Sequence, residues 1–313
     1  MAPSLPGLAY LNRRWQARNR RLVWFLATCL GLSFLALEIY LTHLPSPFSS
    51  APAGFVNDSQ PFGFDALSYY LAHGGANAYA GTSTTIGLGV WRYAPIWLPF
   101  LESLQQLPFF VFVYGVIGAE LLSLLYLTRR WFFASFIFVP VFTELYLANI
   151  TFILAAAIVF ALRQRSRRSW GSSAYAALFF TKVTPFVAVG WHLFRGEWRA
   201  LSVALGTVAL VVLAGFLIDP VTWGAWFHSF LGTSSVHDAS PLGLPFLARA
   251  ILSIPVLFIG ARRGWPALVI LAVFLSLPSI WFPSYSLLIA MPAARDSLPR
   301  HSAQDRVSAI SDA

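Results

Sequence analysis

About ten long apolar segments, separated by short polar stretches, constrain the fold of this chain more than any other feature. A run of roughly 20 mainly apolar residues can cross a bilayer as a helix. Hydrophobic residues account for 58% of the sequence and charged residues for 11%, whereas a soluble domain carries about 25% charged residues. The sequence therefore excludes a soluble globular protein and predicts an all-α, polytopic integral membrane protein. The segments span residues 22–44, 108–127, 131–147, 150–162, 170–181, 185–194, 201–218, 244–260, 265–282 and 284–294.

Arginine clusters lie between these segments and indicate how the chain crosses the membrane. One cluster precedes the first segment, and the others follow every second segment. Because Lys and Arg accumulate on the cytoplasmic side, this spacing predicts that both termini are cytoplasmic. The preference for Arg over Lys hints at a bacterial genome, so we expect a multi-pass protein of the bacterial inner membrane. The clusters lie within residues 13–21, 129–130, 163–168, 195–199, 262–263 and 295–306.

Some apolar stretches do not fit a simple crossing. Residues 95–106 must stay on the outer side as an interfacial or re-entrant helix, because a crossing there would invert every later arginine cluster. Segments 150–162 and 170–181 are too short to span alone, and such half-length helices are tolerated where they are buried in protein or line a cavity. Segment 22–44 is longer than a signal-peptide core, so we expect it to be retained, although Ala51-Pro52-Ala53 resembles a cleavage site.

The chain is expected to form one membrane domain, residues 1–294, followed by a short disordered tail, residues 295–313. Two outer loops are long. Residues 45–92 include an aromatic amphipathic stretch, residues 62–70, which predicts a helix on the outer face. Residues 219–243 open with a Trp-rich run of the kind that settles at the membrane interface.

Several classes of function are excluded by composition and missing motifs. The net charge of +9 does not indicate nucleic-acid binding, because the basic residues do not gather on one face. A single cysteine, Cys29, excludes a disulfide framework and a cysteine-based metal site. The sequence has no phosphate-binding loop, zinc signature or nucleophile elbow, and its six histidines lack metal-ligand spacing. We therefore expect no cofactor, no metal and no nucleic acid; membrane lipids are expected partners, and other membrane proteins are possible ones.

Three basic residues remain outside the cytoplasmic clusters: Arg92, Lys182 and Arg249. Lys182 is the only lysine in the chain and lies where two short apolar segments meet near the outer leaflet. An ionisable residue at such a place is costly and usually serves a function. We interpret its ammonium as the partner of an anionic lipid phosphate; the alternative is a lysine that snorkels to the outer headgroups.

Acidic residues on the outer side supply the candidate general base. Asp65 begins the amphipathic stretch, where its carboxylate could also serve as a helix N-cap. Asp58 lies in a sequence typical of a turn. Glu120 and Glu144 fall within or near predicted spans, where they could pair with a basic residue or remain protonated.

The order of several short motifs is recognisable, although each alone is weak. The chain resembles glycosyltransferase family 87 of the GT-C superfamily from about Phe64 to Tyr285. Its members share Asp-Phe-x-x-Tyr-Tyr in the first outer loop, Tyr-x-Pro-Pro, a mid-chain Gly-Asn or Gly-Gln turn, Lys-x-x-Pro and a late Pro-x-Trp. The matching stretches here are Asp65-Ala66-Leu67-Ser68-Tyr69-Tyr70, Tyr93-Ala94-Pro95, Ala148-Asn149, Lys182-Val183-Thr184-Pro185 and Pro278-Ser279-Ile280-Trp281.

The resemblance implies a GT-C-like bundle and a membrane glycosyltransferase. Such enzymes transfer a hexose, mannose in the mycobacterial member, from a polyprenyl phosphate to a lipid or glycan acceptor on the outer leaflet, with inversion. Asp65 would then be the general base, and Lys182 and Arg92 would bind the donor phosphate. Accessory candidates are Asp58, Tyr69, Tyr70, Tyr93, Asn149, His237, Trp281 and Tyr285.

The chain departs from the family pattern at three places. Ala66 stands where Phe is common, Ala148 stands where Gly is common, and Pro283-Ser284-Tyr285 lacks the expected histidine. Two other functions therefore stay open: a transporter or flippase of a lipid-linked saccharide, and a catalytically degenerate membrane scaffold. A transporter would hold its charged residues near the membrane midplane, whereas the Asp65 and Lys182 pair is expected near the outer surface.

Overall fold

A computed structural model describes residues 64–72, 74–75, 79, 93–163, 169–232, 244–277, 280 and 282–297. The predicted segment 22–44 and most of the predicted tail lie outside these residues. So do four of the candidate site residues: Asp58, Arg92, His237 and Trp281.

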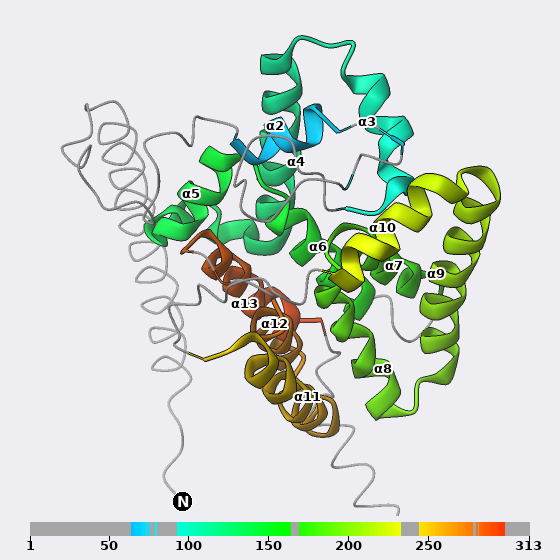
Figure 1. The fold of residues 1–313 in the computed structure, drawn as a ribbon. Helices are drawn as coiled ribbons and strands as arrows, with labels where there is room; N and C mark the ends of the chain where they lie inside the picture. The colour runs from blue at the N-terminus through cyan, green and yellow to red at the C-terminus, as the bar shows by residue number, and fades with distance from the viewer. Residues whose placement is uncertain are drawn as a thin grey trace, which may run out of the picture.

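The described part of the chain is helical and contains no strand, as the apolar segments predict (Figure 1). Its α-helices are α2 (Phe64–Tyr70), α3 (Leu98–Leu104), α4 (Phe109–Thr128), α5 (Val139–Leu147), α6 (Thr151–Arg163), α7 (Ala174–Thr181), α8 (Gly190–Arg195), α9 (Trp198–Ile218), α10 (Pro220–Gly232), α11 (Phe246–Arg263), α12 (Ala267–Leu275) and α13 (Met291–Arg295). The 3₁₀ segments are η1 (Pro95–Trp97), η2 (Arg129–Trp131), η3 (Phe133–Ile137), η4 (Ser169–Ser173), η5 (Thr184–Val189) and η7 (Phe282–Ala290).

Two described helices are long and apolar enough to cross a membrane: Phe109–Trp131, which is α4 with the turn after it, and α9. The pair α5 and α6 is a third candidate if it forms one broken span, since its two helices meet at a bend of 111°. The described residues thus supply two or three helices that could cross a membrane, which is fewer than the ten spans expected from the apolar segments. The length and apolar composition of these helices identify a membrane protein.

Proline explains why several apolar segments become short helices. Pro140 lies in the first turn of α5, Pro185 is the second residue of η5 and Pro266 is the N-cap of α12. Proline has no N–H to donate and its ring clashes with the preceding turn, so each of these residues fits a helix start and interrupts a longer helix. The number of apolar residues in a segment does not show where proline interrupts a helix.

The bend between α5 and α6 is made by a residue with left-handed backbone geometry. Ala148 has a φ of 51° and ψ of 47° and ends α5. A residue with a Cβ is disfavoured there, whereas glycine adopts this conformation freely. The turn therefore gives a physical reason for the glycine that the family pattern has at this position. The bend carries Asn149 to the start of α6.

The second outer loop is partly helical, which the sequence analysis did not anticipate. Asp219 accepts a hydrogen bond from the backbone N–H of Thr222 at 3.1 Å, and Pro220 follows it, so α10 has a capped start. The hydrogen bonds from Thr222 hold the pKa of Asp219 below its ordinary value. Trp223 and Trp226 are each only 3% exposed. Their rings pack into the protein.

Two apolar clusters hold the helices together. The larger cluster lies among α6, α7, α11, α12 and the C-terminal half of α4. It includes Ile158, Leu178 and Val273. The smaller cluster lies under α2, η1 and α10, and includes Tyr69, Phe180 and Trp223. Tyr175 and Leu178 of α7 belong to the larger cluster, whereas Ala176 and Phe180 belong to the smaller one, so α7 lies between the two clusters.

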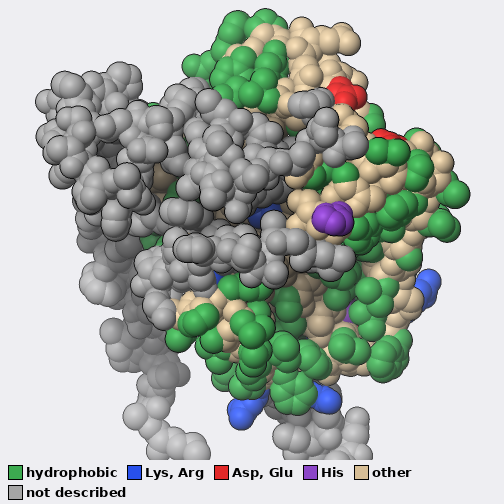
Figure 2. Space-filling view, viewed as in Figure 1, with side chains coloured by type: hydrophobic (Ala, Val, Ile, Leu, Met, Phe, Trp, Pro, Cys, Tyr) green, Lys and Arg blue, Asp and Glu red, His purple; other side chains and the backbone are tan. Residues whose placement is uncertain are grey.

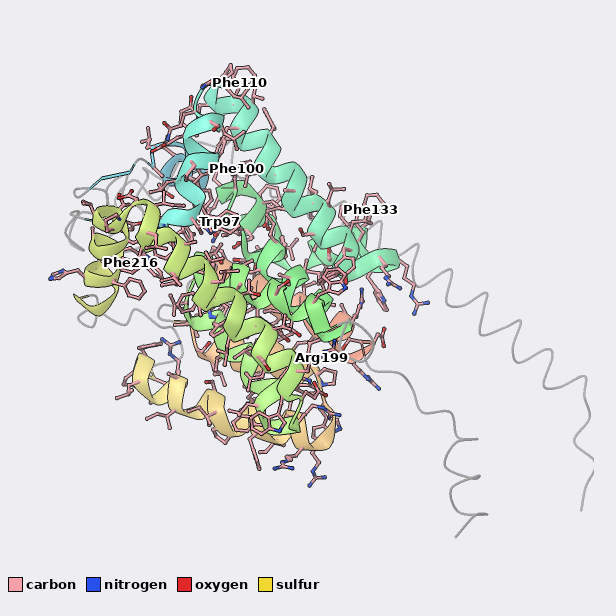
Figure 3. The ribbon with its side chains drawn as sticks, turned by 90° about the vertical axis from the view of Figure 1, so that its right-hand side faces the viewer. Trp97, Phe100, Phe110, Phe133, Arg199 and Phe216 are labelled. Atoms are coloured by element: carbon pink, nitrogen blue, oxygen red, sulfur yellow. The ribbon has the colours of Figure 1, made fainter. Side chains whose placement is uncertain are left out.

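Charged side chains are few on the face shown in Figure 2. Acidic side chains lie at its upper right, and Lys or Arg side chains lie at its lower edge, at its right edge and near its centre. In Figure 3, α4 runs from Phe110 toward Phe133 and α9 runs back from Arg199 toward Phe216, so their arginine-bearing ends lie toward one side. This arrangement agrees with the arginine spacing in the sequence.

Candidate functional site

Asn149 connects the segments that carry the candidate site. Its side-chain oxygen accepts hydrogen bonds from the Tyr69 hydroxyl at 3.1 Å, from the Lys182 ammonium at 3.4 Å and from the backbone N–H of Ile150 at 2.8 Å. Tyr69 comes from α2, Lys182 follows α7, and Asn149 lies in the bend between α5 and α6. Three regions far apart in the sequence are therefore joined at one amide oxygen.

Lys182 is held in place by the end of α7. Its backbone N–H donates to Leu178 at 2.9 Å, and its extended backbone ends that helix. The carbonyl of Phe180, two residues earlier, accepts hydrogen bonds from the Ala94 backbone at 2.8 Å and the Trp97 indole at 3.2 Å. The half-buried Lys182 side chain points to Asn149.

Asp65 lies in the first turn of α2, one helical turn before Tyr69. Its carboxylate forms no hydrogen bond with any residue that the structure describes, so the N-cap interpretation receives no support there. Burial raises the pKa of Asp65 above its ordinary value, and the positive charge of Lys182 counteracts part of that rise. The two predicted site residues thus lie close enough to interact electrostatically.

The hydroxyls of Tyr69 and Tyr93 lie 3.0 Å apart and complete the cluster around Asn149. Their rings meet edge to face with centroids 5.3 Å apart. Burial raises the pKa of both phenols, so both stay protonated and can donate hydrogen bonds at neutral pH. The backbone carbonyl of Tyr93 also accepts a hydrogen bond from the Tyr79 hydroxyl at 2.8 Å.

Two fully buried glutamates cap the start of α6. Glu120 from α4 accepts hydrogen bonds from the backbone N–H groups of Phe152 and Ile153, at 3.0 and 3.2 Å. Glu144 from α5 accepts one from the N–H of Thr151 at 3.1 Å. The first N–H groups of a helix lack partners within the helix and favour negative charge, which explains why carboxylates lie there. Neither of them pairs with the described Arg249, whose guanidinium donates to the carbonyls of Leu275 and Leu277.

Other candidate residues have different surroundings. The Tyr70 hydroxyl donates to the carbonyls of Gln105 and Leu107, so this side chain holds α2 on the turn between α3 and α4. Tyr285 packs against Phe274 with ring centroids 5.1 Å apart, within the larger apolar cluster. The structure brings together Asp65, Tyr69, Tyr93, Asn149 and Lys182.

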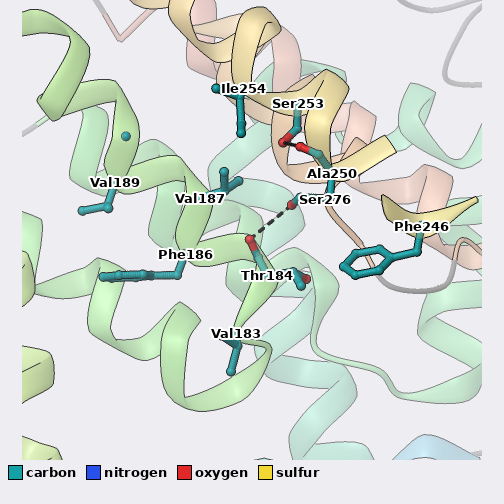
Figure 4. Close-up of a pocket in the computed structure, with 11 residues that line it drawn as sticks. Val183, Thr184, Phe186, Val187, Val189, Phe246, Ala250, Ser253, Ile254 and Ser276 are labelled. Atoms are coloured by element: carbon teal, nitrogen blue, oxygen red, sulfur yellow. Dashed lines mark hydrogen bonds between the residues drawn. The ribbon is translucent and has the colours of Figure 1, made fainter. Parts of the chain in front are cut away.

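An open apolar groove begins directly after Lys182. It has a volume of about 440 Å³ and lies between η5 and α11, and none of the described residues in its wall is charged (Figure 4). The Ser276 hydroxyl donates a hydrogen bond to the Thr184 carbonyl at 3.2 Å, among the residues that line it. The lining residues are Val183, Thr184, Phe186, Val187, Val189, Gly190, Phe246, Ala250, Ser253, Ile254 and Ser276.

Glu120 and Glu144 are not among the site residues that the sequence predicts, although both are ionisable residues in or near predicted spans. The available signal was an ionisable residue within an apolar segment, which marks a functional or paired position. The sequence does not show that Glu144 lies at the start of α6. The bend at Ala148 brings the end of α5 back to that helix start.

Comparisons with known proteins place the chain in a family. The model of glycosyltransferase family 87 matches residues 91–291, which is more than half of the chain. The match includes Tyr93, Asn149 and Lys182 and begins after Asp65. No curated protein and no solved structure matches the chain.

Proposed function

We propose, because the chain belongs to glycosyltransferase family 87, that it transfers a hexose, most simply mannose, from a polyprenyl-phosphate donor to a lipid or glycan acceptor at the outer leaflet. The observation that carries this proposal is the cluster of Asp65, Lys182 and Asn149. The Asp65 carboxylate has no hydrogen-bond partner among the described residues. The Lys182 ammonium makes one hydrogen bond there and has further N–H donors that a ligand could accept. These are the two groups that such a transfer requires.

The donor phosphate would bind at Lys182. An ammonium has three N–H donors, and within the described residues this one makes a single hydrogen bond, to Asn149. The remaining donors can bind phosphate oxygens and stabilise the negative charge that develops as the glycosidic bond breaks. Arg92, which lies outside the described residues but next to Tyr93 in the sequence, is proposed as a second phosphate ligand.

Asp65 would remove the proton of the acceptor hydroxyl. The acceptor oxygen forms a bond to the anomeric carbon, the bond from that carbon to the phosphate oxygen breaks, and its electron pair leaves with the phosphate. The acceptor proton goes to Asp65, and attack opposite the leaving group inverts the configuration. A positioned carboxylate accelerates such a step by about 10²- to 10⁴-fold.

The apolar groove after Lys182 fits the lipid part of the donor. Its wall contains aliphatic and aromatic side chains and three hydroxyl residues, and one of its ends lies one residue from Lys182. A polyprenyl chain in this groove would leave its phosphate beside the ammonium. The proposal places the protein in the inner membrane of a bacterium, in agreement with the arginine distribution.

Activity of the Asp65→Asn variant tests the proposed function. Purified protein in lipid nanodiscs would receive radiolabelled polyprenyl-phosphate mannose and a panel of lipid acceptors. We expect turnover by the wild type and a loss of about 10²- to 10⁴-fold in the variant. The variant should melt at the same or a higher temperature at pH 7, because folding raises the pKa of Asp65 and the ionised carboxylate therefore destabilises the folded state at neutral pH.

Asp219→Asn is the matched control. Asp219 is also an aspartate near the start of a helix, but its carboxylate caps α10, and Asn is an equally good cap. This variant should keep its activity. Equal turnover by Asp65→Asn and wild type would remove Asp65 as the base. Absence of transfer with every donor sugar would overturn the glycosyltransferase assignment, and lipid movement between leaflets without transfer would identify a flippase.

A further inference from the structure

The two glutamates that cap α6 differ in one respect. Both are fully buried, and both accept hydrogen bonds from backbone N–H groups at the same helix start. Glu120 uses both of its oxygens, one for Phe152 and the other for Ile153. Glu144 uses only Oε1, and its buried Oε2 has no hydrogen-bond partner among the residues that the structure describes.

A buried carboxylate oxygen without a partner destabilises the folded state, because it has lost its hydration without compensation. Helix capping alone does not explain it, since Glu120 performs the same role with no oxygen left over. The hydrogen bond from Thr151 to Oε1 fixes the orientation of the Glu144 carboxylate, so Oε2 also has a fixed direction. A fixed, unused acceptor is the arrangement expected of a ligand contact.

Glu144 belongs to the same cluster as Asp65 and Lys182. Its charge acts on Asp65, Lys182, Tyr69 and Tyr93, and its backbone carbonyl accepts the N–H of Asn149 at 3.3 Å. It forms no ion pair with the described Lys182, so its free oxygen is not consumed by the ammonium. Asp65 and Lys182 are partly exposed whereas Glu144 is buried, and Glu144 therefore lies at the deep end of the cluster.

We propose that Glu144 is a specificity-determining residue: its Oε2 accepts a hydrogen bond from a hydroxyl group of the transferred sugar. This inference rests on the proposed function. A sugar hydroxyl supplies the hydrogen-bond donor that this oxygen lacks. A site built to bind a hydroxyl discriminates against an analogue that lacks it, because the buried acceptor then stays unpaired.

A cycle that combines enzyme variants with donor analogues tests this assignment. Wild type and Glu144→Gln would be compared with polyprenyl-phosphate mannose and its 2-, 3-, 4- and 6-deoxy analogues. We expect the wild type to lose about 10- to 100-fold in kcat/KM with one of these analogues. Glu144→Gln should lose a similar factor with the parent sugar and discriminate less than about 3-fold against that same analogue. Equal discrimination by both proteins at every hydroxyl would overturn the proposal.

Glu120→Gln is the matched control, because it removes an equally buried carboxylate from the same helix start. It should lower the melting temperature and leave the discrimination against deoxy sugars as in wild type. If Glu144→Gln does not fold, Glu144→Asp keeps the charge and withdraws the carboxylate by one methylene, and it should reduce the same discrimination. A collapse of discrimination in Glu120→Gln as well would contradict a specific role for Glu144.

Binding measurements separate failure of this inference from failure of the proposed function. If the wild type transfers no sugar, binding of the parent donor and of the deoxy analogues would be measured by calorimetry in nanodiscs. Tighter binding of the parent donor by wild type but not by Glu144→Gln supports the sugar contact even without transfer. No difference between the donors in either protein overturns it. Transfer with unchanged discrimination overturns the inference and leaves the proposed function standing.

Discussion

At the scale of the residue, a small number of hydrogen bonds decides what each polar group can do. Asn149 accepts three of them and therefore works as a connector. Asp65 and one oxygen of Glu144 have no hydrogen-bond partners among the described residues, and these are the groups that we propose bind the substrate. The same residue types at Asp219 and Glu120 cap helices: Asp219 through Oδ1, and Glu120 through both of its oxygens. Residue type alone thus does not separate a structural carboxylate from a candidate functional one.

Substitution of Lys182 is expected to change the pH profile of the enzyme. Burial raises the pKa of Asp65, and the charge of Lys182 offsets part of this rise. Removing the charge in Lys182→Gln should raise the pKa of Asp65 further. Because Asp65 accepts a proton only when ionised, the acidic limb of kcat/KM should move to higher pH, and activity should fall by about 10²- to 10³-fold.

Lys182→Arg provides the control for this experiment, since it retains the positive charge. Its acidic limb should stay at the wild-type position even if its kcat/KM is lower. The measurement is kcat/KM with polyprenyl-phosphate mannose between pH 4 and pH 8. An unshifted limb in Lys182→Gln would show that the two groups do not interact in the working enzyme.

At the scale of the element, α9 packs closely against α10. The Trp223 ring of α10 belongs to the smaller apolar cluster, together with Tyr69 of α2. A Cβ built on Gly215 of α9 would lie only 2.2 Å from the Trp223 ring. Trp223 cannot move away freely, because its ring contacts Phe180, Phe216 and Trp226. Glycine at this position therefore lets two helices approach more closely than any other residue would allow, as in many membrane helix pairs.

Gly215→Ala is expected to destabilise the protein. The added methyl group must displace the Trp223 ring or separate α9 from α10, and overpacking of this kind costs about 1–3 kcal/mol. Thermal unfolding followed by tryptophan fluorescence would measure the loss. Gly206→Ala in the same helix is the control, because nothing lies within 4 Å of its added Cβ. That variant should be as stable as wild type or slightly more stable, and equal losses in both would contradict the packing argument.

At the scale of the whole molecule, the distribution of charge defines two ends. The helices α4 and α9 run in opposite directions, and the arginine-bearing end of each lies toward the same side (Figure 3). The cluster around Asn149 involves the bend after α5 and α2, and Tyr70 of α2 packs against the start of α4, the end away from η2. An outer-leaflet enzyme requires this polarity, because its lipid-linked donor and its catalytic carboxylate must share one side of the membrane.

Cysteine labelling at the two ends of α4 tests the orientation. In a Cys29→Ser background, Gln106→Cys lies before α4 and Arg130→Cys lies after it, and both positions are exposed. An impermeant maleimide added to the outside of spheroplasts should label Gln106→Cys and spare Arg130→Cys. In inverted vesicles the result should reverse. Labelling of Arg130→Cys from outside would overturn the proposed orientation, and labelling of both from one side would show that α4 does not cross the membrane.

The sequence by itself determined the class of protein and the order of its motifs. Apolar segments with few charges can only be buried in lipid or in protein, so an all-helical membrane protein followed from composition. The arginine spacing and the candidate residues Asp65, Asn149 and Lys182 could also be identified from the sequence. Ionisable residues within apolar sequence are costly and therefore mark candidate sites.

Only the tertiary structure decided which of these residues meet and which helices are long. Prolines and the left-handed backbone of Ala148 break apolar runs in ways that hydropathy does not show. The bend at Ala148 brings Asn149 to Tyr69 and Lys182, and it leaves one oxygen of Glu144 without a described partner while both oxygens of Glu120 are bonded. A sequence lists donors and acceptors, but their pairing depends on distances of about 3 Å that only the folded chain sets.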